Sequence, residues 1–117
     1  LLTKMGKGII GYTCGYDKAW NSIVNRDDYS GVILPGAFAD WDNTARKQYN
    51  AQILTGASPE KFGMYLEQLY IKCSNHNVPY IIINAWNEWA EGAYLEPDQK
   101  YGYSYLNEIF KIKNSQQ

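Results

Sequence analysis

The chain has few of the residues that several functional classes require. Its 117 residues include two cysteines, Cys14 and Cys73, and one histidine, His76. Two cysteines are too few for a disulfide framework and form no metal-like pair, so both are predicted to be small buried hydrophobic residues in a reducing compartment. One histidine allows neither a Ser/His/Asp triad nor a histidine-rich zinc site. It follows a predicted helix, where a positively charged imidazole is favoured.

A charge imbalance and long hydrophobic runs are also lacking. With 11 basic and 12 acidic side chains, the net charge is -1. This balance gives no electrostatic reason to expect nucleic acid or an anionic membrane surface as a partner. The longest apolar runs are far shorter than the ~20 residues that cross a bilayer. We therefore expect no nucleic-acid partner and no transmembrane segment.

Aromatic residues, in contrast, are frequent. The chain has 11 tyrosines and four tryptophans. Such rings suit carbohydrate faces, and they suit a packed core and its wet boundary equally well. Taken alone, this composition favours packing.

Two glutamates, Glu88 and Glu91, stand three residues apart just after the apolar run 78–83. That run is typical of a strand buried on both faces, as in parallel sheets covered by helices. If the chain turns after Asn87, residues at i and i+3 have Cβ atoms about 5–6 Å apart. Retaining glycosidases keep their two carboxyl groups at about 5–5.5 Å. The spacing thus permits an acid/base and nucleophile pair.

Trp86 and Trp89 alternate with these glutamates. They could supply apolar walls that raise the pKa of one carboxyl, and a face on which a sugar ring stacks. In the alternative interpretation, Glu88 and Glu91 are solvated loop acids beside two packing tryptophans.

A second polar cluster occupies residues 40–46. Asp40, Asp42 and Asn43 can hold sugar hydroxyls, and Arg46 can pair with a carboxylate or with the diphosphate of a nucleotide sugar. The alternative is an Asx turn with a salt-bridged arginine. The Asp-x-Asp order at 40–42 also resembles the motif of metal-dependent transferases, in which oxygen ligands hold a divalent ion.

Strand and helix patterns alternate along the chain. Residues 8–13 form either a strand or a connecting loop, and Asp17 is a predicted N-cap for a helix with Trp20 on its apolar face. A strand at 32–34 is predicted to be interrupted at Pro35-Gly36 before it delivers Asp40 and Asp42 to the rim.

Helix signals are clearest in the second half. Ser58-Pro59-Glu60 predicts a helix start, and an apolar stripe continues to about Asn75. Asp98 is a predicted cap for a final helix, whose apolar positions are Tyr103, Leu106, Ile109 and Phe110. This order of elements predicts an α/β fold of parallel, right-handed units.

Residues 84–98, followed by Tyr101-Gly102-Tyr103, resemble the C-terminal signature of the WbsX-type glycosyltransferase family of bacterial surface-polysaccharide and lipopolysaccharide gene sets. Their Asn-Glu-Trp-x-Glu-Gly core is also similar to the endo-α-mannosidase (glycoside hydrolase family 99-like) clan. Residues 35–46 and 56–62 resemble two further family blocks, and the blocks stand in family order.

The resemblance implies a (β/α)8 TIM-type barrel with its site at the C-terminal ends of the strands. Such a barrel takes about 250 residues, whereas this chain has 117 and begins with Leu1. We therefore expect residues 1–117 to be a single partial domain, the C-terminal β/α units of a barrel whose other units belong to a longer parent protein.

The resemblance also implies site roles. It makes Glu91 the general acid/base, and it makes Glu88 a base that acts on the 2-hydroxyl of the sugar, as in the mannosidases. Ala90 stands where the mannosidases carry a histidine, which leaves the shape of that subsite open. The expected substrate-binding residues are Asp40, Asp42, Asn43, Arg46, Trp86, Asn87, Trp89, Tyr94 and Glu96.

The predicted function is glycosyl transfer at an anomeric carbon during lipopolysaccharide, O-antigen or capsule synthesis in the bacterial cytoplasm. A sugar nucleotide or an oligosaccharide is the expected substrate, and no metal or cofactor is expected. One alternative is a glycoside hydrolase that acts on a polysaccharide. Another is a non-catalytic carbohydrate-binding or structural fragment.

Overall fold

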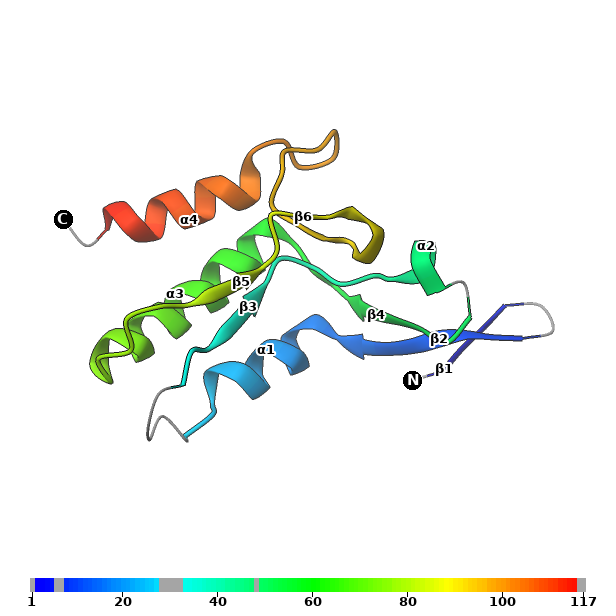
Figure 1. Cartoon of the computed structure of the whole chain (residues 1–117), viewed down its shortest axis with the longest axis horizontal. Helices are drawn as coiled ribbons and strands as arrows, with labels where there is room; N and C mark the ends of the chain where they lie inside the picture. The colour runs from blue at the N-terminus through cyan, green and yellow to red at the C-terminus, as the bar shows by residue number, and fades with distance from the viewer. Residues whose placement is uncertain (1, 6–7, 28–32, 48, 116–117) are drawn as a thin grey trace.

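Strands and helices alternate through most of the chain (Figure 1). The computed structural model describes residues 2–5, 8–27, 33–47 and 49–115. Its elements are β1 Leu2–Met5, β2 Gly8–Gly15, α1 Tyr16–Val24, β3 Gly36–Phe38, α2 Thr44–Lys47, β4 Ala51–Thr55, α3 Pro59–Asn75, β5 Ile82–Asn84, β6 Asn87–Glu88, the 3-10 turn η1 Trp89–Glu91, β7 Ala93–Tyr94 and α4 Ser104–Asn114.

The strands pair in two parallel sets. β2 runs parallel to β4, with β1 antiparallel on its other edge, and β3 runs parallel to β5. β6 and β7 form a short antiparallel hairpin. The predicted α/β fold with parallel strand–helix units is therefore confirmed, and it is compatible with part of a TIM-like fold.

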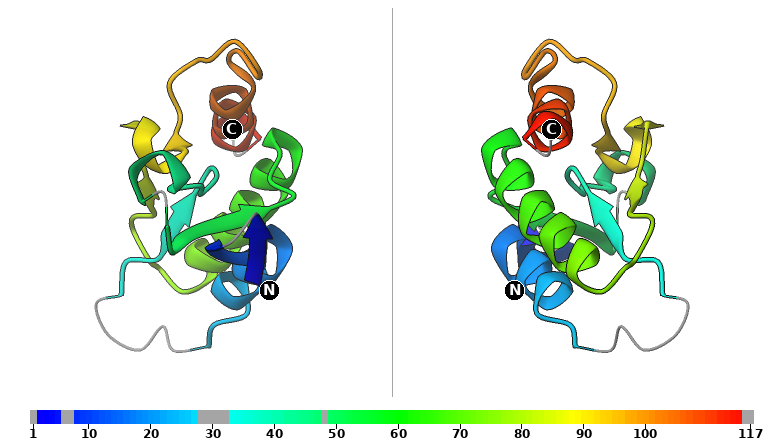
Figure 2. Two further views of the ribbon diagram at one scale, coloured as in Figure 1. Left: turned by 90° about the vertical axis from the view of Figure 1, so that its right-hand side faces the viewer. Right: turned by 90° about the vertical axis from the view of Figure 1, so that its left-hand side faces the viewer.

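Helices α1, α3 and α4 lie side by side with α3 in the middle (Figure 2). The core lies between this helical layer and β3. Trp20 is fully buried there and stacks on Tyr65, with centroids 5.6 Å apart, and on Phe38, at 5.1 Å. Aromatic side chains thus join α1, β3 and α3 into one core.

The long helix α3 begins and ends where its local signals predict. The Ser58 hydroxyl accepts a hydrogen bond from the Lys61 amide at 3.3 Å, Pro59 is the first helical residue, and His76 is the C-cap. The buried residues of its apolar stripe are Phe62, Tyr65, Leu66, Leu69 and Cys73. This stripe packs the helix onto the core, as predicted.

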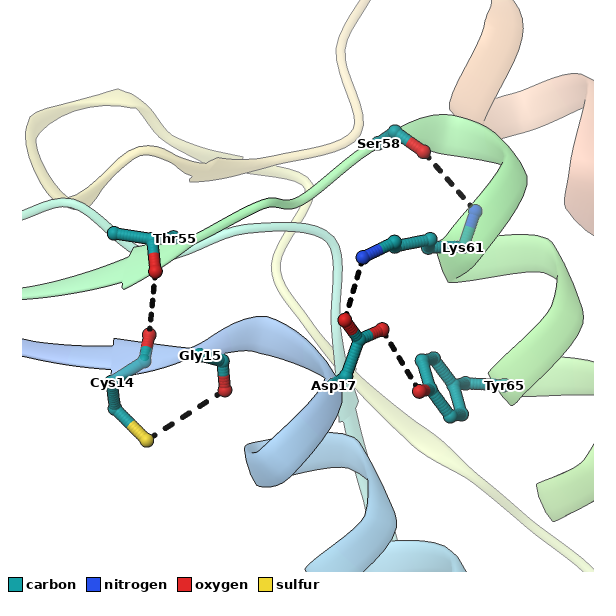
Figure 3. A network of polar contacts seen from close by, with 7 residues as sticks. All are labelled: Cys14, Gly15, Asp17, Thr55, Ser58, Lys61 and Tyr65. Carbon is teal, nitrogen blue, oxygen red and sulfur yellow. Dashed lines mark hydrogen bonds and ion pairs between the residues drawn. The ribbon is translucent and has the colours of Figure 1, made fainter.

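The predicted N-cap Asp17 is wrong by two residues. Gly15 is the N-cap of α1, and Asp17 lies in the first turn. Its carboxylate instead accepts hydrogen bonds from Lys61 Nζ at 2.6 Å and from the Tyr65 hydroxyl at 2.9 Å (Figure 3). The bond from Lys61, followed by that from Tyr65, holds the pKa of the Asp17 carboxyl below its ordinary value. Asp17 therefore ties α1 to α3 rather than capping α1.

The predicted strand 78–83 is wrong in extent and in burial. β5 begins only at Ile82, which is 55% exposed, and Tyr80 is 66% exposed. A strand is buried on both faces only where other elements cover both faces. Within the described sheets, β5 pairs with β3 alone.

Of the strand predicted around 32–34 and beyond the interruption at Pro35-Gly36, the structure shows the part after Pro35. β3 begins at Gly36, directly after Pro35, whose carbonyl accepts a hydrogen bond from the Ile82 amide at 2.9 Å. Residues 29–32 lie outside the described residues. Pro35 therefore precedes the described strand, and Gly36 is its first residue.

Two burial predictions are partly wrong. Cys73 is buried, but Cys14 is exposed, with its thiol 3.6 Å from the Gly15 carbonyl (Figure 3). Of the apolar positions predicted for the final helix, Leu106 and Ile109 pack partly against the core, whereas Phe110 and the N-cap Tyr103 are 67% and 65% exposed. The buried residues of α4 are Tyr105 and Ile112. The apolar stripe of α4 is rotated because α3 meets the face that carries Tyr105. No helix in the described part of the chain is long and apolar enough to cross a membrane.

Candidate active site

The parallel pair β3 and β5 brings the two predicted polar clusters to one edge. Phe38, the last residue of β3, pairs with Asn84, the last residue of β5. The segments that follow both strands therefore start side by side. The Asp42 amide donates a hydrogen bond to the Glu91 carbonyl at 2.8 Å. Residues 40–46 and the glutamate segment are thus in direct contact.

The chain turns between the two glutamates, which is the condition under which they could act together. Asn87 and Glu88 pair with Tyr94 and Ala93 across a hairpin, which turns through η1 and Gly92. The Trp86 carbonyl accepts hydrogen bonds from the amides of residues 95 and 96, both at 3.0 Å, and the peptide bond between residues 84 and 85 is cis. Glu88 and Glu91 are therefore held on a closed hairpin.

Gly92 is required at the end of this turn. Its φ is 63°, and a Cβ atom there would lie 3.0 Å from the Asp42 amide nitrogen. We expect Gly92→Ala to lower the free energy of unfolding by about 1–3 kcal/mol, because it adds backbone strain and crowds the backbone of Asp42. Urea denaturation measures this loss. Gly102→Ala is the control, because its φ is 53° but nothing lies within 4 Å; an equal loss in both variants would show that the contact with Asp42 does not matter.

Glu91 is ion-paired with Arg46. Arg46 Nη1 lies 2.6 Å from Glu91 Oε1, and the side chains are 60% and 19% exposed. This is the salt-bridged arginine of the alternative interpretation, and binding of substrate by Arg46 stays a prediction. The contact fixes one carboxylate oxygen of Glu91 and turns the carboxyl toward residues 40–46, whereas the Glu88 side chain is exposed on β6.

Asp42 and Asn43 shape the loop that carries Arg46. Asp42 Oδ1 accepts a hydrogen bond from the Thr44 amide at 2.9 Å, and Asn43 Oδ1 accepts one from the Gln52 amide at 2.7 Å. Asn43 is only 6% exposed. The Asx turn with a salt-bridged arginine, the alternative raised from the sequence, is therefore present. Contacts of these residues with a sugar stay a prediction.

Asp40 is half-buried at the same edge. Its Oδ1 accepts a hydrogen bond from the Trp41 amide at 2.7 Å, and burial raises the pKa of its carboxyl. Asp40 therefore keeps a proton to a higher pH than an exposed aspartate does. The neighbouring Ala39 carbonyl accepts a hydrogen bond from the buried Tyr16 hydroxyl at 2.8 Å.

A rigid aromatic wall stands beside the glutamates. The rings of Trp89 and Tyr94 stack with centroids 3.9 Å apart and planes 13° apart. Trp89 Nε1 donates to Glu96 Oε2 at 2.5 Å, and the Tyr94 hydroxyl donates to Asp98 Oδ2 at 2.9 Å. Burial, followed by the bond to Asp98, raises the pKa of Tyr94 to about 12. Three predicted substrate-binding residues, at 89, 94 and 96, thus form one unit.

The prediction that Asp98 caps the final helix is wrong. The N-cap of α4 is Tyr103, without a side-chain cap. Asp98 instead accepts a hydrogen bond from the Tyr101 amide at 2.5 Å, and this bond is the main cause that lowers the pKa of its carboxyl. The aspartate therefore holds the turn that follows the aromatic wall.

Trp86, Asn87 and Lys100 complete the neighbourhood. Trp86 is 54% exposed, and Asn87 is exposed on β6. Lys100, which was not singled out from the sequence, lies with its Nζ 4.5 Å from the centroid of the Tyr101 ring. No spacing signal marks a single lysine, so only the fold could reveal it. Within the described ranges, no group of three or more His, Cys, Asp or Glu side chains could hold a metal ion.

Comparison with known proteins identifies the family of this chain. Residues 3–109 match the family model described as Glycosyltransferase WbsX. The chain belongs to the WbsX glycosyltransferase family. It is also 39% identical over 84 residues to the uncharacterized protein WxcX of Xanthomonas campestris pv. campestris strain B100, and equally to WxcX of a second strain. No solved structure shows a significant match.

The match to WxcX is limited to a small part of that protein. It covers 68% of this chain but only 12% of the length of WxcX. The WbsX match includes both the 40–46 loop and the glutamate hairpin. The family name suggests a glycosyltransferase-like enzyme.

Proposed function

We propose that this WbsX-family chain carries the catalytic hairpin of an enzyme that transfers glycosyl groups during surface-polysaccharide synthesis. Glu91 is its general acid/base, and Glu88 assists at the anomeric centre. The observation that carries the proposal is the contact between the hairpin and the 40–46 loop at the end of the parallel pair, where Arg46 holds Glu91.

The geometry suits a proton-transfer role for Glu91. Arg46 engages Oε1, and we assign Oε2 to the glycosidic oxygen. In the forward step, the protonated carboxyl group donates its proton to the leaving oxygen as the bond from C1 to that oxygen breaks. Glu88 meanwhile accepts the proton of the 2-hydroxyl, and the oxygen of that group closes onto C1. In the second step, the Glu91 carboxylate takes a proton from the acceptor hydroxyl, whose oxygen attacks C1. The bond between C1 and the 2-oxygen breaks, and Glu88 returns its proton to that oxygen.

The remaining predicted contacts fit the same reaction. Trp86 lies beside the hairpin and Asn87 lies on it, and they offer a ring face and an amide to the reacting sugar. Asp40 and Asp42 begin the facing loop, where they can accept sugar hydroxyls. A diphosphate of a nucleotide sugar would compete with Glu91 for Arg46, which is 60% exposed.

We further propose that residues 1–117 form the C-terminal β/α units of a larger TIM-type barrel in a bacterial cytoplasmic protein. The exposed side chains Tyr80 and Ile82 support this proposal, because the strand that carries the glutamate hairpin lacks a partner on one edge within the described sheets. Further barrel strands would cover that edge.

The direct test follows the products of the complete protein. It is incubated with aryl glycosides and nucleotide sugars, with and without an oligosaccharide acceptor, and products are identified by mass spectrometry and NMR. We expect transfer products in the wild type and a large loss in Glu88→Gln. The matched control is Glu67→Gln, which changes an exposed glutamate on α3. Free sugar as the main product would favour the hydrolase, and binding without turnover would favour the non-catalytic module.

A further inference from the structure

We propose that a pocket beside the glutamate hairpin is a pyranose-binding subsite for an uncharged sugar unit, one position away from the reacting sugar. The pocket has a volume of about 490 Å³. Its lining residues are Trp89, Tyr94, Pro97, Asp98, Gln99 and Lys100. The pocket lies next to the glutamates because Trp89, one of its lining residues, stands between Glu88 and Glu91 in the chain. That the neighbouring position holds the reacting sugar rests on the proposed function.

The wall of this pocket is held in place by contacts within the chain. Trp89 is 48% exposed, yet Tyr94 stacks on one face of its indole and Glu96 binds its Nε1. An exposed ring that contributes so little to the core does not need such restraint for folding. A fixed ring face lowers the entropy cost of binding a flat, partly apolar ligand such as a pyranose.

The floor of the pocket is equally fixed. Asp98 accepts hydrogen bonds from the Tyr94 hydroxyl on one oxygen and from the Tyr101 amide on the other. These two bonds link the aromatic wall to the turn that presents Gln99 and Lys100. Both of these side chains are exposed, and they supply amide and ammonium groups for sugar hydroxyls. A rigid aromatic face with a few polar groups is typical of a small-molecule site.

The charge around Lys100 favours an uncharged sugar. Lys100 is the only cationic side chain among the residues that line this pocket, and Asp98 lines it too. Contact with Tyr101, followed by the negative charges of Asp40 and Asp98, raises the pKa of Lys100. The lining thus carries one charge of each sign, so a carboxylate or phosphate on the sugar would approach Asp98 as well as Lys100 and gain no net electrostatic attraction.

We assign no ligand to a larger pocket of about 710 Å³. Its lining includes Arg26, Ile33 and Leu34, next to residues 28–32, which lie outside the described residues.

The test measures binding without turnover. In the Glu91→Gln background, saturation-transfer NMR and tryptophan fluorescence follow titrations of the complete protein with methyl α-D-mannopyranoside, methyl α-D-glucopyranoside, the matching methyl glucuronoside, and di- and trisaccharides. We expect the neutral di- and trisaccharides to bind more tightly than the monosaccharides. Lys100→Ala and Gln99→Ala should each raise the Kd of these oligosaccharides by roughly 2- to 10-fold. Trp89→Ala should abolish saturable binding, and Trp89→Phe should retain part of it.

Lys113→Ala, on the exposed end of α4, is the matched control and should leave the Kd unchanged. Thermal melts of every variant establish that it is folded. An unchanged Kd in both Lys100→Ala and Gln99→Ala would overturn the subsite, and tighter binding of the glucuronoside would overturn its preference for uncharged sugars. Failure of the proposed function is distinguishable, because it appears as unreduced turnover in Glu91→Gln and leaves these binding results intact.

Discussion

Glu91→Gln is expected to lower turnover of the complete protein by about 10²- to 10⁴-fold on substrates with a poor leaving group. Glutamine keeps the size and one carbonyl oxygen of the side chain but can neither donate nor accept the transferred proton. Because Arg46 contacts only one carboxylate oxygen in the wild type, the hairpin should stay in place and the KM should change far less than kcat.

The leaving group separates a proton-transfer role from a structural one. A glycoside of an acidic phenol departs without a proton, so its turnover by Glu91→Gln should fall much less than that of an alkyl glycoside. Steady-state kinetics on both substrates measure the difference. An equal loss on both would mean that Glu91 acts by another route, such as through its ion pair, and Arg46→Gln would then show the same pattern.

Trp20→Ala is expected to lower the free energy of unfolding by about 3–5 kcal/mol. Trp20 is fully buried and stacks on Tyr65 and Phe38, so its removal opens a cavity between α1, α3 and β3. Such a loss is a large share of the stability of a typical domain, about 5–15 kcal/mol. Urea denaturation followed by far-UV circular dichroism measures it.

Two companion variants sharpen this measurement. Trp20→Phe should cost less, because it keeps a ring in the cavity and removes an indole N–H that is buried without a hydrogen-bond partner among the described residues. Phe110→Ala, at a position 67% exposed on α4, should change stability by about 0.5 kcal/mol or less. A loss at Phe110 as large as that at Trp20 would contradict the placement of the core.

Local sequence was enough to predict the features that depend on neighbours in the chain. The start of α3 follows from Ser58 and Pro59, because a capping hydroxyl and a proline act within one turn. The spacing of the glutamates indicated only that they could cooperate if the chain turned between them, which it does at residues 89–91. The contact between the two polar clusters follows from two strands that run in parallel.

The partners of Asp17 and Arg46, and the burial of the strands, depend on contacts between distant residues. No local pattern specifies a partner more than 40 positions away. The carboxylate of Asp17 binds α3 instead of capping α1, since Lys61 and Tyr65 approach only when the helices pack. Likewise, packing selected Glu91 rather than Glu88 as the partner of Arg46. Burial also depends on what lies opposite, so the apolar run before the hairpin remained exposed where the described sheet ends at β5.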